Sequence, residues 1–275
     1  MSSPGFLGKL SDGVRQLIRT RGVAMVNERP IVSFTFDGFA KSAAVAAARM
    51  LERRGAAGSF YVDRASCGAT VDGIEQYDLA DLKRLIDNGH EIGCRSARLM
   101  RTPSTGGADV TADLEANAEF ISAHLGDVRM TTFAFPFGDI DLRTKLWMER
   151  RFAACRSTSP GVNIGVADLG ALRAENLWSR SRDAAAVKDL LDRSSAPHSW
   201  LIFFTHDVGE TPGAQGCTPT LFEAALESAL AAGYEVLPVR NALGRIRFGA
   251  RPRGRRSSFL RWLDVRENAG LGRRA

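Results

Sequence analysis

Two apolar segments that end in polar side chains constrain the fold of this chain most strongly. Residues 31–36 and 200–205 are short runs of mostly apolar, β-branched and aromatic residues, followed directly by Asp37 and by His206. Such runs are typical of strands in parallel sheets, which are buried on both faces. In α/β barrels, a strand that ends in a polar residue delivers that side chain to the catalytic face. The two segments therefore predict a parallel sheet with Asp37 and His206 at its carboxyl edge.

Strand-like and helix-like segments alternate from about residue 30 to residue 243. We expect strands at residues 31–36, 58–62, 90–94, 130–135, 152–155, 170–173, 200–205 and 234–238. Helices are expected at residues 40–54, 79–88, 110–125, 142–150, 184–193 and 219–232. This alternation implies right-handed crossovers and a parallel sheet. The prediction is an α/β fold with roughly seven strand–helix units, which form an irregular barrel.

The charge of the chain is concentrated at its carboxyl end. The 275 residues carry a net charge of +6, and residues from Arg245 onward contain ten arginines and two acidic residues, a net +8 that leaves −2 for the rest. We therefore divide the chain into an N-terminal amphipathic extension (1–29), one domain (30–245) and a basic tail (246–275). The tail is expected to be disordered at first, with a short amphipathic helix at 259–265.

Several features favour a cytoplasmic location. No apolar run approaches the roughly 20 residues that cross a bilayer, and the N-terminus lacks a secretory signal pattern. The four cysteines, at positions 67, 94, 155 and 217, are widely spaced, which predicts free thiols in a reducing compartment. The extension has helical apolar spacing interleaved with basic residues. We expect it to pack on the outside of the barrel, with binding to a membrane surface as the less favoured alternative.

The strand that ends at Asp37 resembles the first motif of the polysaccharide deacetylase family, also called the nodulation-protein-B homology domain. Residues 33–38 read Ser-Phe-Thr-Phe-Asp-Gly, where the family has Thr-Phe-Asp-Asp. The resemblance implies a catalytic base at Asp37. It also implies a divalent metal ligand, such as a ligand to zinc, at the next position, which is Gly38 here.

The second motif of the family is His-(Ser/Thr)-x-x-His, after a Gly-His-Glu-Ile-Gly strand. Residues 89–93 match that strand, but the two histidine positions hold Arg95 and Leu99. Metal sites need several N, O or S donors, whereas glycine and leucine offer none and arginine carries a cation. We therefore expect no metal cofactor at the usual position. We expect the Arg95 guanidinium to enter this space and pair with Asp37; the alternative is an Arg95 side chain that swings into solvent.

Two further motifs follow in the order of the family. Residues 134–138, Ala-Phe-Pro-Phe-Gly, resemble its Arg-Pro-Pro-Tyr-Gly motif, with Pro136 in a turn and the Phe137 N–H as an oxyanion donor. The arginine that contacts the base in the family corresponds to Ala134. The resemblance gives His206 the role of general acid, a task suited to a pKa near neutrality.

The resemblance covers residues 30–245 and implies a distorted seven-stranded (β/α) barrel. The reaction of the family is hydrolysis of acetamido groups on sugars of the N-acetylglucosamine type. Our first hypothesis is a metal-free, catalytically impaired member that binds carbohydrate or regulates a partner such as an active paralogue. The second is an active amino-sugar deacetylase with a rearranged metal site. The third, less favoured, is an adaptor whose basic tail binds nucleic acid or anionic lipid.

Overall fold

The computed structural model describes residues 19–101 and 105–248. The amphipathic helix expected in the N-terminal extension lies outside the described residues up to position 18, and residues 22–24 of the extension form a strand, β1, instead of a helix. The short helix expected at 259–265 lies wholly outside the described residues. No helix in the two described ranges is both long and apolar enough to cross a membrane.

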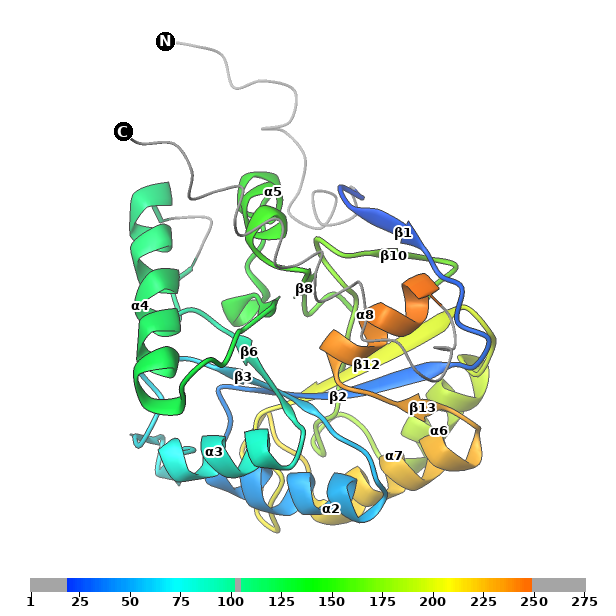
Figure 1. The fold of residues 1–275 in the computed structure, drawn as a ribbon. Coiled ribbons are helices and arrows are strands. Elements are labelled where there is room, and N and C mark those ends of the chain that lie inside the picture. Colours follow the sequence, from blue (N-terminus) through cyan, green and yellow to red (C-terminus); the bar gives the residue numbers. More distant parts are fainter. Residues whose placement is uncertain (1–18, 102–104, 249–275) are drawn as a thin grey trace.

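A curled parallel sheet of seven strands forms the centre of the molecule (Figure 1). In spatial order the strands are β11 (Glu175–Asn176), β12 (Ser199–Thr205), β2 (Ile31–Asp37), β3 (Ser59–Val62), β6 (Glu91–Cys94), β7 (Thr132–Ala134) and β8 (Ala154–Arg156). All six neighbouring pairs are parallel. The irregular seven-stranded (β/α) barrel expected from the sequence is confirmed.

Residue alternation along each strand divides the buried side chains between two faces. On β2, Val32, Phe34 and Phe36 pack in the core beneath the helices, whereas Ile31 packs in a separate core on the other face. Since alternate residues share a face, Asp37 lies on the same face as Ile31. This second face is the concave interior of the curled sheet, and the carboxyl ends of its strands carry the candidate site.

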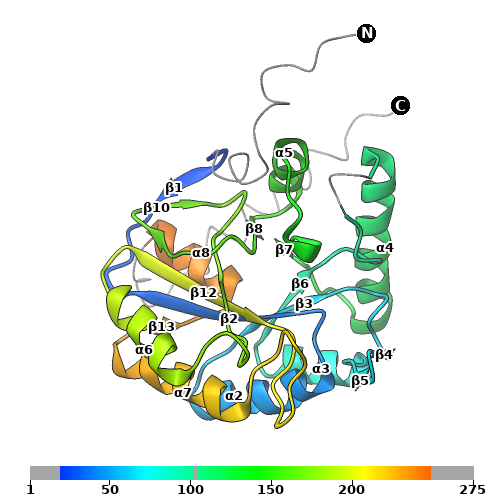
Figure 2. The same ribbon diagram turned by 180° about the vertical axis from the view of Figure 1, so that it is seen from behind.

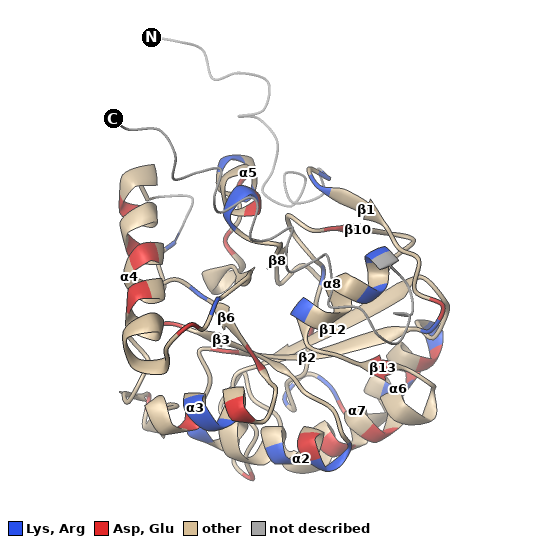
Figure 3. Ribbon diagram, in the orientation of Figure 1, with Lys and Arg blue, Asp and Glu red and all other residues tan. Residues whose placement is uncertain are grey.

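Helices cover the outer face of the sheet. They are the π-helix Ala43–Ala47 with α2 (Ala48–Arg53), α3 (Leu79–Asp87), α4 (Gly107–Leu125), α5 (Leu142–Arg151), α6 (Ala184–Arg193) and α7 (Pro219–Ala231). Helices α2, α3, α6 and α7 lie along one side of β2 and β12 (Figures 1 and 2). Their outer surfaces carry acidic and basic residues side by side, while the central strands are almost without charge (Figure 3).

Side-chain caps explain where several of these helices begin. Asp78 and Asp141 accept hydrogen bonds from the third backbone N–H of α3 and α5, each in a capping box. Asp183 caps α6, and Thr218 caps α7, which continues with Pro219 in its first turn. Each cap satisfies an N–H group that has no partner within the helix, so the sequence fixes these starts locally.

The remaining helix, α8 (Val239–Phe248), closes the amino end of the barrel. The Ser59 hydroxyl accepts a hydrogen bond from the Val239 N–H, and Glu91 Oε2 accepts one from the Arg240 N–H, each at 2.8 Å. Glu91 is fully buried and also accepts from the hydroxyls of Ser59 and Thr132. This carboxylate thus ties β3, β6 and β7 to the positive end of α8. Helix α8 runs beyond residue 245, where we expected the basic tail to begin.

Short strands complete the structure. They are β1 (Gly22–Ala24) paired with β10 (Val166–Asp168), β4 (Thr70–Val71) paired with β5 (Ile74–Glu75), β9 (Asn163–Ile164) paired with β12, and β13 (Glu235–Val236) paired with β2. The strand expected at residues 170–173 is wrong. Only Leu172 of that segment forms a bridge, to Arg156, and the strand that joins the sheet is β11. A turn at residues 169–170 and a bend at residue 171 interrupt the extended conformation there.

Candidate functional site

Five charged or titratable side chains meet at the carboxyl end of the barrel. They come from five different strand ends and are Asp37, Asp63, Arg95, Arg156 and His206. All except the half-buried His206 are at least nine-tenths buried. The sequence predicted three of them, whereas Asp63 and Arg156 were missed.

Arg156 is the direct partner of Asp37. Its Nη2 donates a hydrogen bond to Asp37 Oδ2 from the opposite side of the barrel, 119 residues away in sequence. The Arg156 guanidinium also lies 5.5 Å from the ring centre of Tyr61 and 5.0 Å from that of Phe204, within cation–π range. The resemblance placed the arginine that contacts the base at position 134. Ala134 is the residue paired with Arg156 between β7 and β8, so the cation comes from the neighbouring strand at the same level.

Arg95 occupies the space beside Gly38. Its side chain follows β6 and is 7% exposed, so the alternative of a guanidinium in solvent is excluded. A Cβ atom on Gly38 would overlap Arg95 Nη1 and lie 2.9 Å from Asp63 Oδ2. The ion pair expected between Arg95 and Asp37 is replaced by a looser one: Arg95 Nη1 lies 4.0 Å from Asp63 Oδ2, because Arg156 already bonds Asp37. Arg95 therefore acts on Asp37 through its charge alone.

The two carboxyl groups of the site have different electrostatic settings. Burial favours the neutral acid at Asp37, but the charges of Arg156, Arg95 and His206 together lower its pKa below the ordinary value. At Asp63, burial is again the largest effect, and it raises the pKa despite hydrogen bonds from Ser66 and the charge of Arg95. Asp37 Oδ1 and Asp63 Oδ2 are buried with no hydrogen-bond partner among the described residues. Asp37 is thus held in its ionised form, and its Oδ1 has no hydrogen-bond partner among the described residues.

His206 follows β12 and is held by its backbone. The His206 N–H donates to the carbonyl of Gln215, and its own carbonyl accepts from the Ala40 N–H. Burial and the nearby charge of Arg95 lower the pKa of the ring to about 4, although Asp37 opposes this shift. The near-neutral pKa expected for a general acid is therefore wrong for this environment. The ring is neutral at pH 7.

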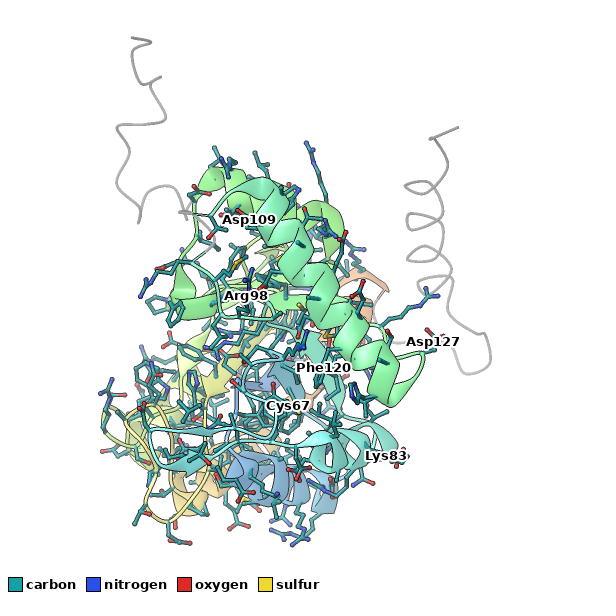
Figure 4. All side chains as sticks on the ribbon, turned by 90° about the vertical axis from the view of Figure 1, so that its left-hand side faces the viewer. Cys67, Lys83, Arg98, Asp109, Phe120 and Asp127 are labelled. Atoms are coloured by element: carbon teal, nitrogen blue, oxygen red, sulfur yellow. The ribbon has the colours of Figure 1, made fainter. Side chains whose placement is uncertain are left out.

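The loop of the second motif is held by a buried carboxylate from α4. Asp113 Oδ2 accepts from the Ser96 hydroxyl at 2.6 Å and from the Ala97 N–H at 2.7 Å, and Oδ1 accepts from the Arg98 N–H and Nε. Figure 4 shows Arg98 beside this helix. Leu99 ends the loop with φ of 54° and is half-buried. The loop therefore keeps a defined shape although Leu99 provides no metal donor.

The turn after β7 forms part of the rim. Pro136–Gly138 is a short 3₁₀ segment in which Phe137 has φ of 58° and is 54% exposed. The Arg101 guanidinium lies 4.5 Å from the centre of the Phe137 ring and pairs with Asp139. Pro136 is buried and forms the turn that the sequence predicts. The role of the Phe137 N–H towards an oxyanion stays a prediction.

The donor set of the site favours polar ligands over cations. Within the described residues, no group of three His, Cys, Asp or Glu side chains is placed to hold a metal ion. The site combines two guanidinium groups as donors with two unpartnered carboxylate oxygens and a neutral imidazole as acceptors. A ligand with both a hydrogen-bond acceptor and a donor matches this arrangement best.

A signal for the two missed residues was present in the strand pattern. Side chains two positions apart on a strand point to the same face, so Asp63 shares the interior face with Tyr61. Arg156 is the last residue of its strand and also points to the interior face. What the sequence could not supply was the curl of the sheet that brings β8 opposite β2.

Comparison with solved structures agrees with this fold. The chitin deacetylase of the fungus Colletotrichum lindemuthianum superimposes with a TM-score of 0.59 and 12% identity, over 85% of this chain and 97% of that one. The Xyl-CE4 domain of a multidomain xylanase from the hindgut metagenome of Trinervitermes trinervoides gives 0.55 and 16%, over 80% and 91%. A CE4 family pseudoenzyme from Bacillus anthracis gives 0.55 and 12%, over 81% and 68%.

A search of curated protein sequences gave no match. The family model for polysaccharide deacetylase, in contrast, matches residues 25–151, which run from β2 through α5 and include the first three motifs. This match assigns residues 25–151, just under half of the chain, to the polysaccharide deacetylase family, and the solved structures agree with the fold of that family.

Proposed function

We propose that this protein is a metal-free member of the polysaccharide deacetylase family that binds an amino sugar without deacetylating it efficiently. One observation carries the proposal. The buried Arg95 guanidinium takes the space that a side chain at position 38 would need. A fixed positive charge therefore stands next to the base, at the position where the family pattern has metal ligands.

The residues present do not fit a divalent metal. Gly38 and Leu99 have no donor atoms, and Arg95 is a cation that keeps its proton at any ordinary pH. Asp37 is already bonded to Arg156. Binding a metal here would place a third positive group beside the guanidinium groups of Arg95 and Arg156.

The titration behaviour of the two predicted catalytic residues supports the same proposal. A general acid must carry a proton at the working pH, but the pKa of His206 is lowered to about 4. Asp37 has a lowered pKa, which makes it a weaker base. Arg95 contributes to both pKa shifts, so the presence of arginine at this one position, where the family motif has histidine, impairs both Asp37 as a base and His206 as an acid.

The same geometry supports binding of an acetamido group. Its carbonyl oxygen accepts hydrogen bonds from a guanidinium, and its N–H donates to a carboxylate oxygen such as the unpartnered Asp37 Oδ1. A carboxylate ligand would meet Asp37 at close range and is disfavoured. The proposed ligand is accordingly an N-acetylglucosamine-type sugar, with Phe137 at the rim as an aromatic contact.

The experiment combines zinc titration of the purified protein, acetate release from chitooligosaccharides, and calorimetric binding of the same oligosaccharides. We expect no stoichiometric zinc, no chelator-sensitive acetate release, and measurable sugar binding that is weakened by Asp37→Asn. The triple variant Gly38→Asp, Arg95→His, Leu99→His restores donor types at the three positions, and it should bind zinc. Histidine tolerates the positive φ of position 99 better than most residues do.

Stoichiometric zinc in the unmodified protein with chelator-sensitive acetate release would overturn the proposal in favour of an active deacetylase with a rearranged metal site. Absence of sugar binding would remove the carbohydrate role. Regulation of an active paralogue would then be tested by co-purification of the two proteins.

A further inference from the structure

A cavity lies away from the candidate site, among residues that follow β8. Its volume is about 510 Å³, within the range of about 300–1,000 Å³ that holds small molecules in proteins. It is formed by β9, β10 and the segment that leads to them from β8, together with Arg19 and Arg173. None of the five residues of the candidate site lines it. This cavity has no part in the proposed function.

The charged groups of the cavity leave a positive excess. Asp168 lines it, but its carboxylate accepts hydrogen bonds from the buried Lys145 Nζ at 2.6 Å and from the N–H groups of Arg21 and Gly170. Its charge is therefore balanced within the fold. Arg19 and Arg173 form no ion pair with any acidic residue of the described part of the chain. The two guanidinium groups thus have no counter-charge from the cavity lining.

One wall of the cavity is apolar and unusually exposed. Ile164 is 58% exposed and Val166 is 37% exposed, and Val162 lies beside them in the lining. Exposed apolar side chains in a concave site gain about 25 cal/mol for each Å² that a ligand removes from water. A hydrocarbon group is the chemistry that this wall fits.

The walls are held in place before any ligand binds. Asn163 Nδ2 donates to the carbonyls of Arg173 and Trp200, and its Oδ1 accepts from the Arg173 N–H. Arg173 Nη1 donates to the Pro160 carbonyl at 3.0 Å, above Gly161, where a Cβ atom would lie only 2.9 Å from the same nitrogen. The guanidinium of Arg173 is therefore directed by the backbone around it. Such preorganisation lowers the entropy cost of binding.

We propose that this cavity binds an amphiphilic anion, with a phosphate or carboxylate head at Arg19 and Arg173 and a short hydrocarbon chain against Val162, Ile164 and Val166. The guanidinium groups supply charge-assisted hydrogen bonds to the head, which are about twice as strong as neutral ones. The apolar wall discriminates against a bare inorganic anion. The positive pair discriminates against an uncharged amphiphile.

Calorimetry of the full chain with monomeric octyl phosphate tests this proposal. Octyl glucoside, with the same chain and no charge, and inorganic phosphate, with the head alone, are the reference ligands. We expect each reference to bind at least tenfold more weakly than octyl phosphate. Arg173→Gln and Ile164→Asp should each weaken octyl phosphate about tenfold, since one removes a charged donor and the other part of the apolar wall. Arg53→Gln, an exposed arginine on α2, is the matched control and should change nothing.

Two results would overturn the proposal. One is equal binding of octyl phosphate and octyl glucoside, or binding unaffected by both variants. The other is no binding of octyl phosphate by the full chain. This result overturns the proposal even if deletion of residues 1–18 makes binding appear, because a segment of the chain itself would then be the occupant of the cavity. Anionic phosphatidylglycerol vesicles distinguish a lipid headgroup from a free ligand. Vesicle binding that persists in Ile164→Asp while monomeric octyl phosphate fails to bind would locate the contact elsewhere.

Discussion

The coupling between Gly38 and Arg95 can be measured with the smallest possible change, Gly38→Ala. Gly38 has φ of 42°, where a residue with a Cβ is disfavoured by about 1–2 kcal/mol. The added Cβ would also overlap Arg95 Nη1, so the buried guanidinium must leave its place. Its departure leaves Asp63 without a cation and removes one of the charges that stabilise ionised Asp37. Loss of a charged interaction at a buried group costs about 2 kcal/mol, and the total is about 3–4 kcal/mol.

The double-mutant cycle with Arg95→Ala separates the two contributions. In that background the guanidinium is absent, and Gly38→Ala should cost only the conformational 1–2 kcal/mol, which gives a coupling energy of about 2 kcal/mol. Urea unfolding followed by circular dichroism measures all four proteins. Gly55→Ala is the matched control, because Gly55 has φ of 64° and a Cβ there would meet no atom within 4 Å. A coupling energy below about 0.5 kcal/mol would refute the idea that Arg95 and a side chain at position 38 exclude each other.

Three further predictions follow from buried charge. Arg156→Ala should destabilise the fold by about 3–5 kcal/mol in urea unfolding and raise the pKa of Asp37, because the carboxylate loses its bonded partner; an unchanged midpoint would contradict this. The pKa of His206 is about 4 when folded and about 6.5 when unfolded, so stability is full above about pH 6.5 and falls as the pH drops towards 4, by on the order of 3 kcal/mol. His206→Gln should flatten this part of the profile relative to the unmodified protein, and an identical slope would disprove the assignment. Glu91→Ala should cost about 3–5 kcal/mol in urea unfolding because three donors, two of them buried, lose their acceptor, whereas Glu119→Ala on the exposed face of α4 should stay within about 0.5 kcal/mol in the same assay.

The strands that the sequence predicted best are those whose pattern is fixed locally. Residues 31–36 and 200–205 are buried on both faces, and this composition suits few other structures. The segment at 170–173 failed because its apolar residues contact the barrel through a single bridge rather than a ladder. Composition cannot separate these cases, since both leave apolar side chains buried. The starts of the capped helices were also predictable, within a few residues.

The site was predictable where a residue ends a recognisable strand, as Asp37 and His206 do. The partner of Asp37 was not, because Arg156 reaches it across the barrel, and strand curl is a property of the whole sheet. The burial of Arg95 was expected. Its position opposite Asp63 was not, because it depends on which of the two guanidinium groups, Arg95 or Arg156, bonds Asp37 in the folded barrel. Competition of this kind is decided by geometry that the sequence does not state.

The pairing of β2 has a consequence for synthesis of the chain. This early strand is bonded to β12 and β13, whose residues lie about 165–205 positions later, and Ile31 faces both Trp200 and Glu235. Until those segments leave the ribosome, β2 has only β3 beside it and one apolar edge without its partner. Strands that wait in this way fold late and are exposed to pairing with other chains. Nascent chains that stop before α8 should therefore depend on chaperones, while release of residue 248 should mark the point at which the barrel can close.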